Sequence, residues 1–143
     1  MDESQRKALV GATLAYNLLA KRTIFATKFG LTKEQTLVMN ALELTGPIWI
    51  SELSNRLAIP KEQASRAVSA LEKQGLLLRE PVQSDRRAVA VSLTSEGRVF
   101  LEESHEEMDR LLEGNLEKLS DEEARELTAA AETSMRLLLK ALC

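Results

Sequence analysis

Three consecutive charged residues, Asp85, Arg86 and Arg87, lie within the stretch REPVQSDRRAVAVSLTSEG of residues 79–97. Beyond them, apolar residues alternate with small ones at Val89, Val91 and Leu93. This period of two predicts a β-hairpin with the charges at its tip. A carboxylate that accepts a charge-assisted hydrogen bond from a guanidinium fixes the direction of that guanidinium. Asp85 therefore either aims Arg87 at an anionic target or forms an Asx-type turn that leaves both arginines solvated.

A second set of polar residues recurs with helical spacing between Pro60 and Gly75. One face of this predicted helix is apolar: Ala64, Ala67, Val68 and Leu71. The opposite face is polar: Lys61, Gln63, Arg66, Ser69 and Lys73. Arginine and glutamine can hydrogen-bond to base edges, whereas serine and lysine suit phosphates. The pattern predicts either a solvated face or base contacts from Gln63 and Arg66, with phosphate contacts from Ser65, Ser69 and Lys73.

The single histidine, His105, has metal-capable glutamates on both sides of it in the sequence. Zinc sites normally use three or four ligands in which His or Cys dominates. We therefore predict no metal and no cofactor, and we expect His105 to pack at a helix interface. No nucleophile–base pair, Gly-rich phosphate loop or pair of carboxylates stands out, so an enzyme is not expected.

Helical periodicity predicts elements on both sides of these residues. A first helix is expected from Ser4 to Phe29, stopped by Gly30. A second helix is expected from a capping box at Thr32 and Gln35 to about Leu44. The third helix is predicted to be capped by Ser51, after a short β-prone segment at residues 48–50.

A tight joint, Ala58-Ile59-Pro60, connects the third helix to the polar helix described above. Two helices joined in this way match a helix-turn-helix, in which the second helix enters the DNA major groove. The hairpin that follows is then a wing, whose oriented arginine can enter a narrow minor groove. The expected fold is mainly α with a small β-hairpin wing.

The last third of the chain predicts two long helices with apolar faces. Thr94 caps the first, which is expected to reach about Leu119, and a capping box at residues 120–123 opens the second. A second copy of the chain could bury these faces by a two-fold contact. The alternative is that they fold back on the N-terminal helix.

Charge is unevenly distributed over the 143 residues, whose net charge is −3. Residues 99–143 hold twelve acidic and five basic side chains, whereas residues 1–98 carry more basic than acidic ones. This asymmetry favours a basic working face kept apart from an acidic region. Apolar runs are too short to span a membrane, and no signal peptide is evident. With Cys143 as the lone cysteine, a cytoplasmic location is expected.

The segment ASRAVSALEKQGLLLREPVQSDRRAVAVSLTSEG, residues 64–97, resembles the signature of the MarR family of winged-helix transcription regulators. That signature combines a recognition helix, Gly-Leu, Arg, a loop, Asp-x-Arg, an alternating strand and Leu-Thr-x-x-Gly. Its elements correspond here to Leu71, Gly75-Leu76, Arg79, Asp85-Arg86-Arg87, Val89-Ala90-Val91 and Leu93-Thr94-Ser95-Glu96-Gly97. The length and the helix order of the whole chain also resemble the family.

The resemblance implies one domain over residues 1–143, with a winged-helix DNA-binding part at 31–97 and helical dimerisation parts at 1–30 and 98–143. It implies a homodimer on a palindromic site in double-stranded DNA, often released by a small ligand or an oxidant. By position, the DNA contacts fall on Lys61, Gln63, Ser65, Arg66, Ser69, Arg86 and Arg87, with Asp85 as the orienting carboxylate.

Two departures from the family pattern qualify this prediction. Pro60 stands where the family often has a Ser or Thr cap, so a first-turn hydroxyl contact to phosphate is missing. No cysteine lies in the N-terminal helix or near the wing, which argues against peroxide sensing by cysteine.

Aromatic, sulfur-containing and histidine side chains form a candidate effector pocket between the two parts, with plain core residues as the alternative: Tyr16, Phe25, Phe29, Met39, Trp49, His105 and Met108. The leading hypothesis is a ligand-responsive, DNA-binding repressor. The rival is a helical protein-interaction module that uses its winged helix for protein contacts. The wing arginines favour DNA, because a protein-binding wing has no special need for them.

Overall fold

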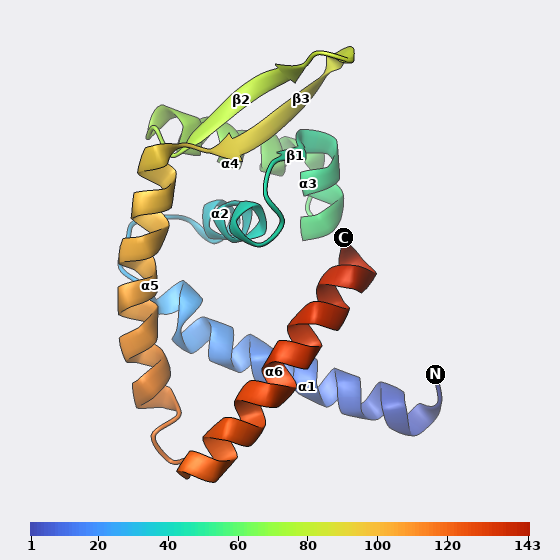
Figure 1. Cartoon of the computed structure of the whole chain (residues 1–143). Coiled ribbons are helices and arrows are strands. Elements are labelled where there is room, and N and C mark those ends of the chain that lie inside the picture. The colour runs from blue at the N-terminus through green and yellow to red at the C-terminus, as the bar shows by residue number, and fades with distance from the viewer.

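The computed structural model describes the backbone of residues 1–143 and the side chains of residues 1–84 and 88–143. In chain order the elements are α1 (Glu3–Arg22), the 3-10 helix η1 (Ile24–Ala26), α2 (Lys33–Thr45), β1 (Ile48–Trp49), α3 (Ile50–Leu57), α4 (Lys61–Lys73), β2 (Leu77–Val82), β3 (Asp85–Leu93), α5 (Ser95–Asn115) and α6 (Asp121–Leu142). The three strands form one antiparallel sheet in the order β1-β3-β2. The predicted fold class, mainly α with a β-hairpin wing, is confirmed (Figure 1).

A hydrophobic core holds α2, α3, α4 and the sheet together as a winged body. Its most deeply buried side chains come from every one of these helices and from β2 and β3: Val38, Met39, Leu42, Leu53, Val68, Leu71, Leu77 and Val91. In the sheet, Ile48 pairs with Val91 and Leu77 pairs with Leu93. Because these pairs place apolar side chains against α2 and α4, the sheet fixes the wing relative to the helices.

Local signals define the start of α2 and the end of α4 as predicted. Thr32 and Gln35 form the expected capping box at the start of α2. Gly75 adopts a φ of 75°, and the amide of Leu76 donates to the carbonyl of Leu71 at 3.0 Å. A left-handed residue of this kind ends a helix and suits glycine. The chain leaves α4 there and enters β2 directly.

Three predicted helix boundaries were wrong. The first helix ends at Arg22 rather than Phe29, because buried Thr23 leaves the helical conformation and the chain continues as η1. The third helix is not capped by Ser51, since β1 runs directly into α3 and places Trp49 at the N-cap. Helix α5 stops at Asn115 instead of Leu119, where the Asn115 side chain donates to the Leu111 carbonyl.

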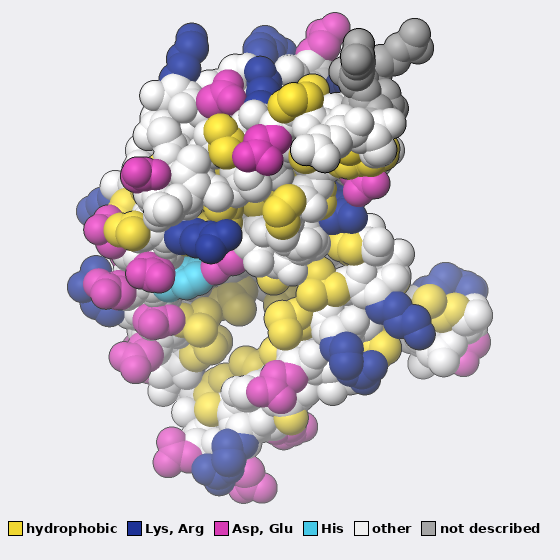
Figure 2. Space-filling model, turned by 45° about the horizontal axis from the view of Figure 1, so that its top comes forward, with side chains coloured by type: hydrophobic (Ala, Val, Ile, Leu, Met, Phe, Trp, Pro, Cys, Tyr) yellow, Lys and Arg dark blue, Asp and Glu magenta, His cyan; other side chains and the backbone are white. Residues whose placement is uncertain are grey.

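Helices α1 and α6 form two long arms outside the winged body, and neither has a buried residue. In Figure 1 α5 runs away from the body, and α6 returns from its far end at an angle. Large apolar side chains on the arms are exposed: Leu9, Val10, Leu14, Tyr16, Leu18, Leu127, Met135, Leu137, Leu138 and Leu142. Figure 2 shows apolar side chains gathered around the hollow between the body and the arms.

Candidate nucleic-acid interface

Helix α4 follows α3 through a sharp left-handed turn. Ala58 has a φ of 52°, and Pro60 occupies the N-cap of α4 without a side-chain hydrogen bond. Pro60 therefore gives no hydroxyl at the helix start, as its position in the sequence predicts. The amide of Ala64 still bonds to the Pro60 carbonyl at 3.1 Å, which keeps the first turn regular.

The apolar face of α4 anchors the helix and leaves the opposite face in solvent. Ala64, Val68 and Leu71 are fully buried against the rest of the winged body. Among the side chains on the opposite face, four predicted DNA contacts are exposed: Lys61, Gln63, Arg66 and Lys73. No described carboxylate lies within 4.0 Å of the nitrogens of the three cations in this set. This face therefore presents unpaired positive charge and side-chain donors on a rigid base.

Ser65 and Ser69, the two serines predicted to contact phosphate, are only partly exposed. They lie on the flank of α4 that faces β2, where Arg79 reaches them. The Arg79 Nη2 donates to the Ser65 carbonyl at 3.1 Å and to the Ser69 Oγ at 2.9 Å. The structure thus places these two residues beside a third polar residue that the sequence did not mark as part of the site.

The β2–β3 hairpin projects from the same end of the body as α4 (Figure 1). Pro81 pairs with Val89 and Val82 with Asp85, with an irregularity in register between these pairs. Strand β3 therefore begins before the alternating residues Val89, Val91 and Leu93 that predicted it, and the connecting turn is at residues 83–84. The predictions for the side chains of Asp85, Arg86 and Arg87 lie outside the described residues and stay predictions.

Comparison with known proteins places this arrangement in a family. A model of the MarR family matches residues 29–88. The HTH-type transcriptional repressor MdtR of Bacillus subtilis (strain 168) is 30% identical over 120 residues, covering 79% of this chain and 77% of that protein. The chain belongs to the MarR family.

Solved structures agree with this assignment at the level of the fold. Wild-type MarR from Escherichia coli in its apo form superposes with a TM-score of 0.69 at 21% identity, covering 94% of this chain and 96% of that chain. The structure of Bordetella bronchiseptica BpsR, solved for the mechanism by which 6-hydroxynicotinic acid regulates its DNA binding, gives a TM-score of 0.60 at 23% identity and covers 92% of this chain and 98% of that chain. The winged helix-turn-helix of this MarR-family transcription regulator is therefore the arrangement of α3, α4 and the hairpin.

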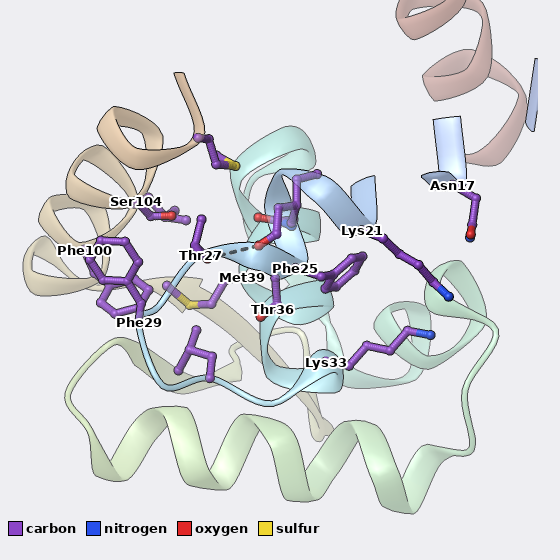
Figure 3. A pocket seen from close by; sticks show the side chains of 15 residues that line it. Asn17, Lys21, Phe25, Thr27, Phe29, Lys33, Thr36, Met39, Phe100 and Ser104 are labelled. Carbon is purple, nitrogen blue, oxygen red and sulfur yellow. Dashed lines mark hydrogen bonds between the residues drawn. The ribbon is translucent and has the colours of Figure 1, made fainter. Parts of the chain in front are cut away.

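A cavity of about 210 Å³ lies at the seam between the arms and the winged body of this MarR-family chain. Of the predicted pocket residues, Phe25, Phe29, Met39 and Met108 line it, whereas Tyr16, Trp49 and His105 do not. The rings of Phe29 and Phe100 meet edge to face with centroids 5.4 Å apart. In Figure 3 these two rings lie at one end of the cavity and the ammonium groups of Lys21 and Lys33 at the other.

His105 lies at a helix interface, as predicted, and joins α5 to α2. Its Nε2 is 2.7 Å from the Glu43 Oε1, with both side chains partly exposed. No cluster of three or more His, Cys, Asp or Glu side chains that suits a metal ion occurs within the described part of the chain. Among the helices that the structure describes, none is long and apolar enough to cross a membrane.

Sequence reasoning missed Arg79 and the two pocket lysines as site residues. Arg79 was noted only as part of the family signature, because a strand residue gives no sign of the helix that it will contact. Lys21 and Lys33 belong to different helices, and only the tertiary structure brings them to one cavity. The alternation of β2 does place Arg79 on the face opposite Leu78, which was the one available signal.

Proposed function

We propose that this MarR-family regulator binds a palindromic site in double-stranded DNA as a homodimer and acts as a ligand-responsive repressor. The observation that carries the proposal is the exposed cationic face of α4, whose lysines and arginine lie within 4.0 Å of no described carboxylate and whose opposite, apolar face is buried. A helix of this kind fits the major groove, where side chains reach base edges. MdtR, a relative over most of the chain, is itself named a repressor.

Within this proposal, the exposed residues of α4 divide by chemistry. Arg66 and Gln63 contact bases, because their side chains can form paired hydrogen bonds with base edges. Lys61 and Lys73 contact phosphates near the two ends of the helix, and Ser65 and Ser69 do so along its flank. Arg86 and Arg87 provide the wing contact, with Asp85 orienting a guanidinium.

The arms supply the homodimer in this proposal. Helices α1 and α6 have no buried residue and expose a series of leucines, so a single chain leaves their apolar faces in water. A two-fold contact buries the same faces of both copies at once. Two α4 helices related by that axis require a DNA site with matching symmetry.

The seam cavity supports the ligand response. It combines aromatic rings with two ammonium groups, which suits a small aromatic acid. Because the cavity is lined by α1, α2 and α5, a ligand there contacts both an arm and the winged body. BpsR, of similar fold, is described as regulated in DNA binding by 6-hydroxynicotinic acid, itself an aromatic acid. No catalytic role is proposed, and the need to reach DNA supports the cytoplasmic location expected from the sequence.

The test measures binding to duplexes selected by the parent protein from a random pool, compared with a random-sequence duplex. Arg66→Ala is expected to weaken specific binding by about 1–3 kcal/mol while changing random-duplex binding less, because Arg66 reads bases. Lys118→Ala, a change of a cation far along the chain from α4, is the matched control and should bind as the parent does. A parent that enriches no sequence and binds no duplex at low salt would contradict the proposal.

A further inference from the structure

Arg79 extends from β2 across the flank of the recognition helix α4. One nitrogen, Nη2, donates to the Ser65 carbonyl at 3.1 Å and to the Ser69 Oγ at 2.9 Å, and it lies 3.5 Å from the Ser65 Oγ. The other terminal nitrogen, Nη1, is 4.0 Å from the Glu72 Oε1. The guanidinium is therefore directed along α4 by partners at three successive turns of that helix.

Glu72 also fixes the backbone from which Arg79 extends. Its Oε2 accepts a hydrogen bond from the Arg79 amide at 3.3 Å. The root of the wing is thus attached to α4 through the backbone and the side chain of the same residue. Arg79 is partly buried, with a side chain that is 30% exposed, which limits its freedom to turn toward a ligand.

The hydrogen bonds of Arg79 determine what the Ser69 hydroxyl can do. A serine hydroxyl has one proton to donate and two lone pairs that accept. Within a helix that proton usually bonds back to the carbonyl four residues earlier, which here is Ser65. The Ser65 carbonyl already accepts the Arg79 Nη2 in addition to the helical amide of Ser69. Both of its lone pairs are used, and in the described part of the chain the Ser69 Oγ accepts from Arg79 but donates to no carbonyl. The Ser69 proton is therefore free to point away from the helix.

We propose that Arg79 is a positioning residue for DNA binding, which turns the Ser69 hydroxyl into an outward donor for a DNA phosphate. This inference rests on the proposed DNA-binding function. Ser69 lies between the wing-facing flank and the exposed face of α4, so a proton directed outward from it reaches the DNA side. In this arrangement Arg79 is assigned no phosphate contact of its own, because Ser65 and Ser69 accept both protons of Nη2 and the Glu72 carboxylate holds Nη1 beside α4 at 4.0 Å.

The experiment is a double-mutant cycle on the full chain, with a duplex selected by the parent from a random pool. Affinities of the parent, Arg79→Met, Ser69→Ala and the double variant are measured by fluorescence anisotropy at several salt concentrations. Each single variant is expected to bind about tenfold more weakly, since each loses one hydrogen bond to a charged group. The double variant is expected to have the same affinity as the single variant that binds DNA more weakly, because both changes remove the same phosphate contact. The salt dependence should stay that of the parent.

Two further variants separate positioning from general damage. In the Arg79→Met background, Arg66→Ala should weaken binding by the same factor as it does in the parent. A helix that is intact apart from the Ser69 hydroxyl still contacts the bases through Arg66. Disorder of the whole helix would abolish the effect of Arg66→Ala together with that of Ser69→Ala, and would overturn the proposal. Arg110→Met is the matched control, because it makes the same chemical change at an exposed residue near the far end of α5.

Other outcomes also decide against the inference. A salt slope reduced by about one in Arg79→Met would show that Arg79 contacts a phosphate directly. Additive losses, or parental affinity in a folded Arg79→Met variant, would equally overturn the positioning role while leaving DNA binding intact. A parent that binds no duplex overturns both proposals.

If Arg79→Met does not fold, Arg79→Lys takes its place in the same cycle. Lysine keeps the charge but lacks the planar fork that spans two acceptors. It should therefore keep the parental salt slope and weaken the effect of Ser69→Ala. Full parental affinity with full sensitivity to Ser69→Ala would contradict the inference.

Discussion

The winged body and the arms differ in how much apolar surface each buries within one chain. In the body, α2, α3, α4 and the sheet share one core, and side chains such as Leu53, Leu71 and Val91 are fully buried. In the arms, α1 and α6 are regular, well-capped helices without a single buried residue. Burial stabilises a helix far more than its own propensity does. The body therefore buries its core within one chain, whereas one chain leaves the apolar faces of the arms exposed.

The joint between the two regions is the start of α5, where it packs on the end of α4. Thr94 caps α5, its hydroxyl bonds to the Gly75 carbonyl, and its amide donates to the Leu76 carbonyl at 3.1 Å. Gly97 lies so close to this turn that a Cβ on it would be 2.2 Å from the Leu76 backbone oxygen. The arms thus connect to the recognition helix through a contact that admits no side chain.

Gly97→Ala is expected to have the largest effect, because the clash is with backbone and must be relieved by moving α5 or the α4–β2 turn. We expect a loss of at least about 3 kcal/mol in the free energy of unfolding. Denaturant titration followed by circular dichroism measures it. Gly114→Ala in the same helix is the control, since nothing beyond its chain neighbours and the adjacent backbone of α5 lies within 4 Å of a Cβ there. That change should stabilise by about 0.5–1 kcal/mol. Equal stability of the two variants would contradict the close contact.

Leu138→Glu tests whether the arms are completed by a second copy. Leu138 in α6 is 49% exposed, so a charge costs little in one chain but is costly inside a two-fold interface. Sedimentation should show a dimer for the parent and a monomer for the variant at micromolar concentration. Leu71→Ala in the body is the counterpart: it should lower the free energy of unfolding by about 2–5 kcal/mol and leave the dimer intact. A parent that sediments as a monomer would refute the proposed dimer.

The sequence predicted the features that depend on nearby residues and missed those that depend on tertiary contacts. The capping boxes at Thr32 and Ser120, the glycine that ends α4 and the buried face of α4 depend on neighbours within a few residues, and all were predicted correctly. The predicted end of α1 was wrong, because burial of Thr23 in the tertiary structure overrides an otherwise helical pattern.

The partly predicted site shows the same limit. The polar face of α4 follows from helical periodicity, since its residues are exposed wherever the apolar face is buried. The hydrogen bond from Arg79 to Ser69 joins a strand to a helix, and the periodicity of either element alone does not predict such a contact. Aromatic residues at helical spacing gave no reason to prefer Phe29, which lines the cavity, over Trp49, which does not.

The smallest expected effect on stability is that of a ligand in the seam cavity, where it would contact both an arm and the winged body. Lys21 belongs to α1 and Lys33 to α2, and both line the cavity with Phe25 and Phe29. A carboxylate between the two ammonium groups would therefore contact both regions at once. Benzoate, the simplest aromatic carboxylate, is the probe.

Benzoate at ten times its dissociation constant should stabilise the parent by about 1.4 kcal/mol, because it binds only the folded chain. The measurement is the shift in melting temperature as a function of benzoate concentration at fixed ionic strength. Lys21→Met and Lys33→Met should each reduce the shift, while Lys28→Met, a neighbouring exposed lysine outside the cavity, should leave it unchanged. Benzamide, which has the same ring without the charge, should stabilise less than benzoate. Equal stabilisation by the two compounds would mean that the lysines do not recognise the carboxylate, and the seam would then join arm and body through apolar packing alone.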